Sequence, residues 1–361
     1  MQIIADRRAL HQIPETEWNL PKTAKYVTDS LQKLSCQVFA PAENAVCAWF
    51  DFGAERTIAF RSDMDALPIQ ECNDLAYVSH HPGKMHACGH DAHMAMLLEL
   101  ARRIDAMEKL DKNVLLVFQP AEESPGGAKI LCDTGILEKY RVEAIFGIHI
   151  WPELPEGQVF SRKGPLMARA SETTVEFTGK ASHIGRADRG RDAMAAAVKF
   201  YQRAMELEAS VPDGVYRLLK FGKFHSGTAR NIISAHTRME GSLRVFDDEL
   251  FDYMQENLTR IVQEVEAETG CKGTIHFLES YPAVCNPDWL FQRVNAITPI
   301  GELDMPSMVA EDFSWYQRQV PGILFFLGTG DSPALHASNF NFNEEIMIKG
   351  ADFWETLVRE F

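Results

Sequence analysis

Four short apolar runs mark the sequence, and polar, chemically reactive residues follow each of them. The runs are residues 57–60 (TIAF), 113–118 (NVLLVF), 144–148 (AIFGI) and 323–327 (ILFFL). Continuous apolar runs of this length predict strands that are buried on both faces of a sheet. Residues 93–110 lie between the first two runs and repeat apolar side chains at helical spacing. Strands that alternate with helices predict an α/β domain with a mixed, largely parallel sheet flanked by helices.

The polar segments that follow the four runs carry most of the candidate chemistry. They read RSDMDALP (61–68), QPAEESPGG (119–127), HIWPE (149–153) and GTGDSPALH (328–336). In open α/β sheets, ligands bind outside the carboxyl ends of the strands. Because all four segments are expected at that edge of the sheet, we predict that they form one shared site.

The middle of the chain has a different pattern. The strand-like segments TTVEFTG, RMEGSLRVF and KGTIHFLE flank two helical segments, near residues 192–208 and 247–269. This pattern predicts a small α+β domain inserted into the larger one, with plausible crossings at 164–165 and 281–282. We therefore expect a catalytic domain from residues 1–166 and 282–361 and a satellite domain from residues 167–281.

Composition and charge narrow the class of protein. Of the 361 residues, 46% are apolar and 24% are charged, which is an ordinary globular balance. The formal net charge of −15 argues against nucleic acid or an anionic membrane as partner, since both need a basic face. The first 15 residues lack the apolar core of a signal peptide, and no stretch approaches the roughly 18 apolar residues of a membrane span. The seven cysteines are scattered and odd in number, so we expect free thiols and a cytoplasmic location.

The segment 85–93, MHACGHDAH, is the densest cluster of potential metal ligands. It places one cysteine and three histidines within nine residues. Thiolate and imidazole are preferred ligands of zinc-like ions. Cys88 and His90 are two residues apart, and Gly89 between them permits a tight turn, so both can face one ion or bridge two. The alternative is a polar turn that caps the following helix through Asp91.

Two adjacent glutamates in QPAEESPGG form the second motif. Adjacent carboxylates at a strand end repel each other unless a cation lies between them. In a two-metal hydrolase, one carboxylate binds metal and the other accepts a proton from water. Most Glu-Glu pairs are simply solvated, but Glu122 and Glu123 follow an apolar run and precede a Gly-Gly loop.

Two isolated histidines and two aspartates complete the candidates. His149 directly follows the run AIFGI, and His336 lies in SPALHAS. By itself, a histidine beside apolar residues is more often a satisfied core residue than a ligand. Asp63 and Asp65 are either ordinary turn aspartates or carboxylates that orient a metal ligand.

At this point the motifs resemble a known family. RSDMDALP, MHACGHDAHMAMLL, FQPAEESPGGA, GIHIWPELPEG, TARNII and LHAS occur in an order typical of the aminoacylase/carboxypeptidase-type metallo-amidohydrolases. The sequence looks closest to the branch of N-acetyldiaminopimelate deacetylases, hippurate hydrolases and plant auxin-conjugate hydrolases. The similarity spans nearly the whole chain, starting at RRALHQIPE.

The resemblance implies a centre of two divalent metal ions, which could be zinc, manganese, cobalt or nickel. The ligands that it implies are Cys88, His90, Glu123, His149 and His336. Glu122 would be the general base that takes a proton from the attacking water. Asp65 would orient the centre, and Asp63 is the weaker candidate for that role.

The resemblance extends to the satellite domain, which often mediates dimers in this family. His183 in GKASH matches a histidine thought to polarise the scissile carbonyl, often from the partner subunit. Asn231 and Arg244 match positions linked to substrate contact, although Asn231 could only cap a turn and Arg244 could only face solvent. The segment HIGRADRGRDAM lacks a proline usual in relatives and contains three arginines, so substrate choice can differ here.

These features predict an enzyme that cleaves the amide bond of a small N-acyl amino acid, as a homodimer through the satellite domain. The leading candidate is an N-acetyldiaminopimelate deacetylase of lysine biosynthesis. A dipeptidase, a carboxypeptidase or a hippurate hydrolase would use the same centre. A catalytically silent binding protein on this fold is the alternative from another class. No G-x-S-x-G nucleophile motif is present, so no covalent acyl-enzyme is required.

Overall fold

The computed structural model describes residues 1–278 and 281–361, which divide into two compact units. The larger unit comprises Met1–Leu166, Val284–Pro306 and Glu311–Phe361. The smaller unit comprises Met167–Ala283 and Ser307–Ala310, so the chain returns to it once. The strands β7 (Gly164–Met167) and β12 (Val284–Asn286) pair in a two-stranded sheet where the chain leaves and re-enters the larger unit.

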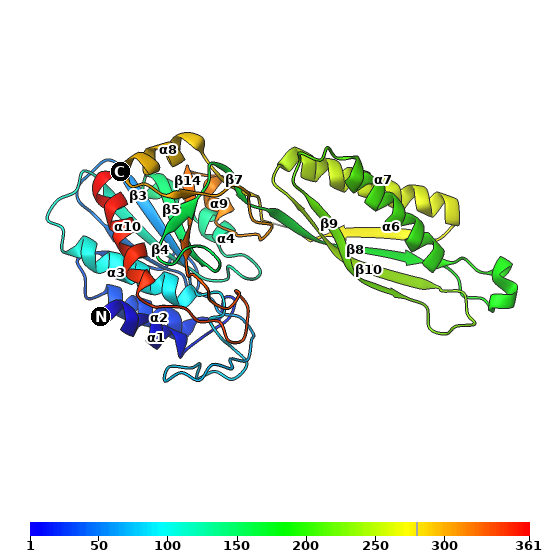
Figure 1. Cartoon of the computed structure of the whole chain (residues 1–361), viewed down its shortest axis with the longest axis horizontal. Helices are drawn as coiled ribbons and strands as arrows, with labels where there is room; N and C mark the ends of the chain where they lie inside the picture. The colour runs from blue at the N-terminus through cyan, green and yellow to red at the C-terminus, as the bar shows by residue number, and fades with distance from the viewer. Residues whose placement is uncertain (279–280) are drawn as a thin grey trace. The chain divides into compact units, whose positions relative to one another are not determined.

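The larger unit is built on an eight-stranded sheet, coloured from blue to orange in Figure 1. The strand order is β1 (Gln37–Phe39), β2 (Val46–Phe50), β4 (Asn113–Gln119), β3 (Thr57–Asp63), β5 (Val142–Trp151), β14 (Gly322–Gly328), β6 (Val159–Ser161), β13 (Gly301–Glu302). The central strands β4, β3, β5 and β14 run parallel, whereas β2 and β6 pair with them antiparallel. The predicted mixed, largely parallel sheet is confirmed, and the four apolar runs are its four central strands.

Helices flank this sheet, and they pack on it or on one another. They are α1 (Gln2–His11), α2 (Pro21–Leu31), α3 (His90–Asp105), α4 (Ala128–Asp133), α5 (Ile136–Lys139), α8 (Asp288–Ile297), α9 (Ser314–Gln317) and α10 (Ile346–Glu360). Helix α3 contacts α1, α10 and β3, and it contributes a long row of buried apolar residues to the core. The helix predicted over residues 93–110 ends earlier in the structure, at Asp105. There the Met107 N–H bonds to the Ile104 carbonyl and tightens the last turn before β4.

The smaller unit has an α+β fold, with a separate antiparallel sheet. Its antiparallel sheet has the order β11 (Lys272–Phe277), β8 (Arg169–Thr178), β10 (His236–Val245), β9 (Leu218–Ser226). Helices α6 (Ala193–Ser210) and α7 (Asp248–Thr269) pack on the sheet, and alternate residues such as Val175 and Phe177 are buried between them. The 3₁₀ helix η1 (Ile184–Arg189) precedes α6. All five predicted elements are present; Glu279, the last residue of KGTIHFLE, lies outside the described residues.

The helices of residues 1–278 and 281–361 do not include one that is both long enough and apolar enough to span a membrane.

Candidate metal centre

The turn that carries Cys88 and His90 lies at the start of α3. Gly89, between them, has φ +84°, and a Cβ there would approach Ile150 Cδ1 to within 2.1 Å. Only glycine allows the turn to lie this close to the end of β5, the strand that carries His149. The alternative in which Asp91 caps α3 is wrong: Gly89 holds the cap position, and no side chain caps this helix.

The glutamate pair is placed by the loop after β4. The Asp65 carboxylate accepts hydrogen bonds from the backbone N–H groups of Glu122 (2.9 Å) and Glu123 (3.1 Å). Its Oδ1 also lies 3.6 Å from His90 Nδ1, which leaves His90 Nε2 directed to the two glutamates, at 4.0 Å from an oxygen of each. A carboxylate that holds a ligand by its second nitrogen is common around metal sites, so Asp65 lies where an orienting residue would be needed.

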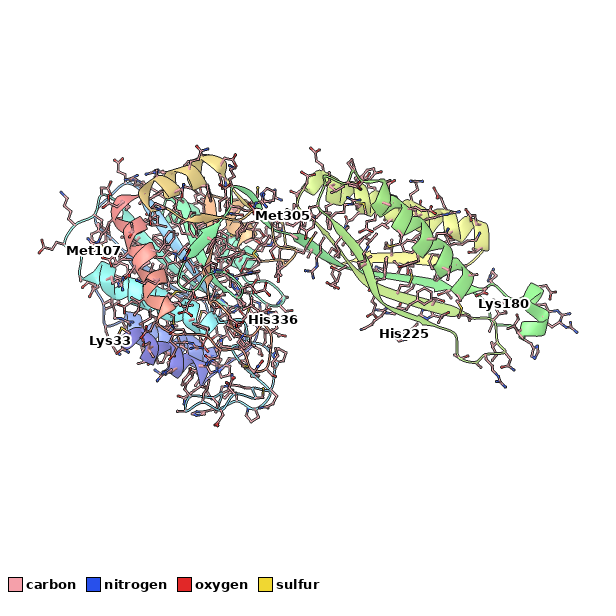
Figure 2. The ribbon with its side chains drawn as sticks, in the orientation of Figure 1. Lys33, Met107, Lys180, His225, Met305 and His336 are labelled. Carbon is pink, nitrogen blue, oxygen red and sulfur yellow. The ribbon has the colours of Figure 1, made fainter. Side chains whose placement is uncertain are left out.

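The remaining predicted ligands converge on the same place. His149 Nε2 lies 3.4 Å from Cys88 Sγ, and His336 Nε2 lies 3.2 Å from Glu123 Oε1. His336 adopts a positive φ of 64°, and its N–H bonds to the Ala87 carbonyl (2.8 Å), which ties its loop to the Cys88 turn. Figure 2 labels His336 in the larger unit.

The donor atoms form overlapping groups whose members lie within 4.8 Å of one another. One group is Cys88, His90 and His149; another is Cys88, Glu123 and His336; a third is His90, Glu122 and Glu123. Cys88, His90 and Glu123 each belong to two of these groups, so each of the three could serve either of two cations. Neither ring nitrogen of the fully buried His90 has a hydrogen-bond partner in the part of the chain that the structure describes. A buried imidazole whose ring nitrogens lack hydrogen-bond partners, beside a thiol and two carboxylates, fits a divalent-metal site.

The pKa shifts of Glu122 and His149 also fit a metal site. Burial, together with the charges of Glu311, Glu123 and Asp312, raises the pKa of Glu122 well above its usual range, despite the opposing Arg61. Burial and the nearby His93 lower the pKa of His149, so its imidazole stays neutral and able to ligate. His149 Nδ1 is oriented by the Ile150 carbonyl at 2.6 Å, which leaves Nε2 free for an ion.

Asp63 acts through His93, a histidine to which the sequence motif assigns no role. Asp63 Oδ1 lies 2.7 Å from His93 Nδ1, and His93 Nε2 accepts a hydrogen bond from the Ile150 N–H (2.9 Å). His93 therefore carries its proton on Nδ1 and fixes the backbone beside His149. The sequence signal was present, since His93 is the third histidine of MHACGHDAH.

A buried charge network supports the site and was not predicted. Arg61 donates to Gln119 Oε1 (2.8 Å), Asp312 Oδ1 (2.8 Å) and Asp63 Oδ2 (2.9 Å). The second oxygen of Asp312 accepts from the N–H groups of Gly127 and Ala128, both at 2.9 Å, and so holds the end of the glutamate loop. The available signal was an arginine directly after an apolar run predicted to be a buried strand, because a charge that is buried requires partners.

The N-terminal segment contributes a second buried network. Arg7 Nε donates to Asp91 Oδ2 (3.2 Å), and Arg7 Nη2 donates to Asn341 Oδ1 (3.0 Å). His11 Nδ1 lies 2.8 Å from the same Asp91 oxygen. These contacts join α1 to the start of α3, beside His90, and to the loop that follows His336.

In the smaller unit the structure brings two of the three predicted residues together. Ile184 N–H bonds to the Asn231 carbonyl (3.0 Å), and His183 forms an antiparallel bridge with Ile232. Arg244 does not join them. It lies near the far end of β10, eight residues or about 26 Å from His236, and it donates to the Met308 carbonyl (2.6 Å). Arg244 is half-buried.

Comparison with known proteins agrees with this geometry. Residues 59–360 match peptidase family M20/M25/M40. An uncharacterized hydrolase of Staphylococcus epidermidis is 33% identical over 370 residues, which cover 98% of this chain and 97% of the relative. Similar hydrolases of Staphylococcus aureus are 32% identical, with the same coverage. The chain therefore belongs to peptidase family M20/M25/M40 and is a hydrolase of that family.

Two solved structures resemble the whole chain. A protein of methicillin-resistant Staphylococcus aureus, described as a candidate aminohydrolase, has a TM-score of 0.93 and 28% identity, covering 99% of this chain and 96% of that one. The Bacillus subtilis YXEP protein, described as a dinuclear metal-binding peptidase of the M20 family, has a TM-score of 0.86 and 27% identity, with the same coverage. The family predicted from the sequence motifs is confirmed.

Proposed function

We propose that the chain is a metal-dependent amidohydrolase that cleaves N-acyl amino acids. The observation that carries the proposal is the convergence of five ligand-type side chains and a buried glutamate from separate segments of the larger unit. Within this class, N-acetyldiaminopimelate is the leading candidate substrate, on the resemblance of the sequence motifs.

Cys88, His90, Glu123, His149 and His336 would hold two divalent cations. Thiolate and imidazole suit zinc, and hydrolytic pairs also accept manganese, cobalt or nickel. When bound, such cations lower the pKa of water and polarise the amide carbonyl.

Glu122 is the base in this proposal. It takes a proton from water as the water oxygen bonds to the amide carbon, and it passes that proton to the nitrogen when the C–N bond breaks. The products are a carboxylic acid and a free amine, so atoms and charges balance without a covalent intermediate. Asp65 supports this role, because it holds the backbone N–H groups of Glu122 and Glu123.

His183 would donate a hydrogen bond to the oxygen of the scissile carbonyl. Its Nδ1 accepts from the Gly185 N–H (3.1 Å), so the neutral ring carries its proton on Nε2, where it can donate outward. Asn231 and Arg244 would contact the substrate, with Arg244 gripping its carboxylate.

The separation of Arg244 from His183 within the smaller unit supports a homodimer. If both side chains contact one small substrate, they would come from two copies of the chain, because about 26 Å of strand separates Arg244 from His236, which begins β10 just after the loop that carries Asn231. An exposed apolar stripe on α6 supports the same proposal: Met194, Val198 and Tyr201, at helical spacing, are 45%, 53% and 42% exposed. The strand β9 is a sheet edge, open to pairing with another copy. The larger unit would be catalytic and the smaller unit dimerising.

A cytoplasmic location completes the proposal and is supported by the cysteines. All seven are free thiols, and Cys88 needs reducing conditions to serve as a ligand.

Cleavage of a peptide bond is the second candidate, because the family and a similar structure are described as peptidases. A dipeptidase, a carboxypeptidase or a hippurate hydrolase would use the same ligands and the same base. A silent binding protein would not need a complete ligand set beside a buried glutamate.

The test is a hydrolysis panel on metal-stripped protein reloaded with zinc, manganese, cobalt or nickel. N-acetyl amino acids including N-acetyldiaminopimelate, N-benzoyl amino acids and dipeptides would be compared by kcat/KM. The proposal expects the N-acyl amino acids to be cleaved at least about tenfold better than dipeptides. A preference for dipeptides would establish the peptidase alternative, and no cleavage with any metal would reject both.

A further inference from the structure

Four cationic side chains gather at the end of the smaller unit that carries His183. Three come from the segment 180–189, and the fourth comes from the loop 227–235, which the backbone bridge between His183 and Ile232 holds beside that segment. All four side chains are exposed. The group, here called the basic rim, consists of Lys180, Arg186, Arg189 and Arg230. Figure 2 labels Lys180 at this end of the unit.

The basic rim is unpaired, unlike other arginines of the same unit. Arg203, Arg238 and Arg260 pair with glutamates at 2.6, 2.6 and 2.5 Å. The rim side chains make no such ion pair with any residue in the described ranges 1–278 and 281–361. Acidic residues outnumber basic residues in this chain by 51 to 36, so most cations are expected to have a carboxylate nearby. A cluster of unpaired cations departs from that expectation.

The acidic residues near the basic rim are too few to cancel its positive charge. The segment 180–192 contains two carboxylates, Asp188 and Asp192. Asp192 caps α6, where it accepts hydrogen bonds from the N–H groups of Met194 (2.9 Å) and Ala195 (3.1 Å). The segment therefore carries four cations, Arg191 included, against two carboxylates, and with Arg230 the region has a net charge of +3, so the rim can attract and bind an anion.

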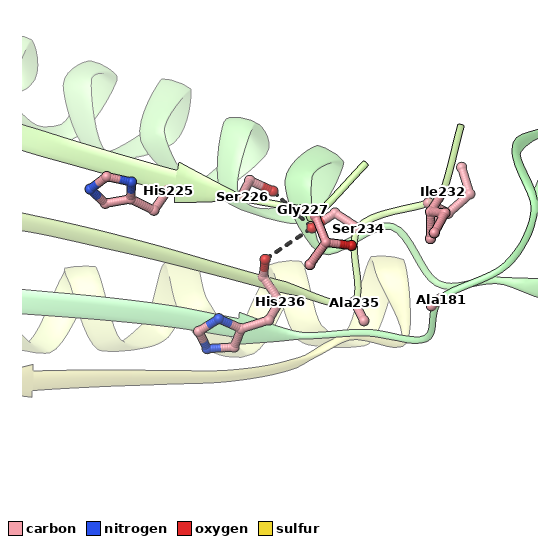
Figure 3. A pocket seen from close by; sticks show the side chains of 10 residues that line it. Ala181, His225, Ser226, Gly227, Ile232, Ser234, Ala235 and His236 are labelled. Atoms are coloured by element: carbon pink, nitrogen blue, oxygen red, sulfur yellow. Dashed lines mark hydrogen bonds between the residues drawn. The ribbon is translucent and has the colours of Figure 1, made fainter. Parts of the chain in front are cut away.

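A hollow of about 240 Å³ lies between the same two segments, and Figure 3 shows its lining. Ala181 and Ile232 form one side of it, and the exposed imidazoles of His225 and His236 lie at the other. Ser226 and Ser234 face each other across a 2.8 Å hydrogen bond. The lining is thus mixed, with polar groups from the two serines and the two histidines and apolar groups from Ala181 and Ile232.

The basic rim lies close to His183 because the two are near each other in the sequence. Arg186 is three residues from His183, so their Cα atoms are at most about 11 Å apart. An arginine side chain spans much of that distance. A substrate whose carbonyl meets His183 can therefore reach the rim with another part of the same small molecule.

We propose that the basic rim selects anionic substrates: N-acyl amino acids that carry a second negative group besides the α-carboxylate, such as dicarboxylates. The inference rests on the proposed function, which brings His183 to the scissile carbonyl. It deepens that function by naming the charge of the substrate, and two of the arginines proposed to recognise that charge, Arg186 and Arg189, lie in HIGRADRGRDAM.

The test compares matched substrates that differ by one charge. N-acetylglutamate against N-acetylglutamine varies the amino-acid side, and N-succinylalanine against N-butyrylalanine varies the acyl side. The metal-loaded full-length enzymes would be wild type, R186A/R189A, the conservative R186K/R189K, and R203A/R260A. The last variant removes the same total charge from helices α6 and α7, away from the rim.

For at least one pair, wild type is expected to favour the anionic member. R186A/R189A should lower kcat/KM for that member about five- to tenfold and leave the neutral member within twofold. R186K/R189K should restore most of the loss, R203A/R260A should behave as wild type, and raising NaCl from 50 to 500 mM should mimic the double alanine variant.

Three results would count against the proposal. Equal hydrolysis of both members of both pairs by wild type, or an equal loss on both members in R186A/R189A, would overturn it while the proposed function stood. The same loss in R203A/R260A would assign the effect to overall charge and overturn it also. No hydrolysis of any N-acyl amino acid by metal-loaded wild type would reject the proposed function and this inference with it.

Discussion

Glu122 is the residue on which the proposed chemistry depends most directly. It is 6% exposed and faces Glu123, Glu311 and Asp312, which keep its pKa raised in addition to the effect of burial. A buried acid close to other carboxylates holds a proton readily, which is what a base needs once it has taken a proton from water.

We expect Glu122→Gln to lower kcat by at least about 10³-fold while the metal content stays at two ions per chain, because the amide keeps the shape and loses the basic oxygen. Turnover would be measured on the best substrate of the panel, and metal content by elemental analysis. Glu108→Gln, at an exposed position of the same unit, is the matched control. Near-normal turnover in the Glu122→Gln variant would remove Glu122 from the mechanism.

Cys88 carries the second prediction at this scale, because its sulfur belongs to two groups of ligand atoms. Replacing thiolate with a neutral hydroxyl weakens both groups at once. Cys88→Ser should therefore retain fewer than two zinc ions per chain after dialysis, with thermal stability of the metal-free protein within a few degrees of wild type. Cys72→Ser changes an exposed thiol and should retain both ions. Two tightly held ions in Cys88→Ser would remove Cys88 from the proposed ligand set.

Among the elements, α1 and α3 are joined most tightly by charge. Arg7, His11 and Asp91 are each at most 2% exposed, and their contacts connect the N-terminal helix to the turn that carries His90. Burial alone would lower the pKa of His11, but the hydrogen bond and charge of Asp91 and the hydrogen bond to Glu71 outweigh it and raise the pKa from 6.5 to about 9. Folding thus favours protonated His11.

This shift predicts a pH-dependent stability. A pKa raised in the folded state stabilises fully below the unfolded value, near 6.5, and the contribution disappears as pH rises through about 9. The difference in free energy of unfolding between wild type and His11→Gln, on the order of 2–3 kcal/mol at pH 6, should therefore shrink towards pH 9.5.

Denaturant unfolding of metal-free protein at several pH values would measure this difference. His225→Gln removes an exposed imidazole of the smaller unit, and its difference from wild type should stay near zero throughout. A His11→Gln difference that does not change between pH 6 and 9.5 would show that the imidazole is not charged in the folded protein.

At the scale of the whole molecule, the predicted site residues are divided between the two units. The larger unit contains every predicted metal ligand and the base, whereas the smaller unit contains His183, Asn231 and Arg244. The wide spacing of Arg244 from the other two is a property of the antiparallel sheet, in which β10 runs away from the loop that carries Asn231.

If a second copy completes the site, a charge in the apolar stripe of α6 should abolish both assembly and activity. Val198→Glu is expected to reduce the mass in light scattering from about twice 40.7 kDa to a single chain, and to lower kcat/KM at least about 100-fold. Ile130→Glu alters an exposed apolar residue of the larger unit and should leave both unchanged. A fully active monomeric Val198→Glu would refute the dimer proposal.

Sequence pattern alone determined the architecture, because it depends on local periodicity. The four apolar runs became the four parallel central strands, and the motifs after them lie at one edge of the sheet, as strand direction requires. Residue chemistry likewise identified Cys88, His90 and the Glu122–Glu123 pair as candidates, since thiol, imidazole and paired carboxylates are rarely grouped without a cation.

Only the tertiary structure decided which side chains hold the site in place. Arg61 meets Asp312 across 251 positions of sequence, and Arg7 meets Asn341 across 334. Such pairs have no local signal, because their distances follow from how strands and helices pack and not from spacing along the chain. The same reason explains why the sequence could not show that Arg244 lies far from Asn231 within the folded smaller unit.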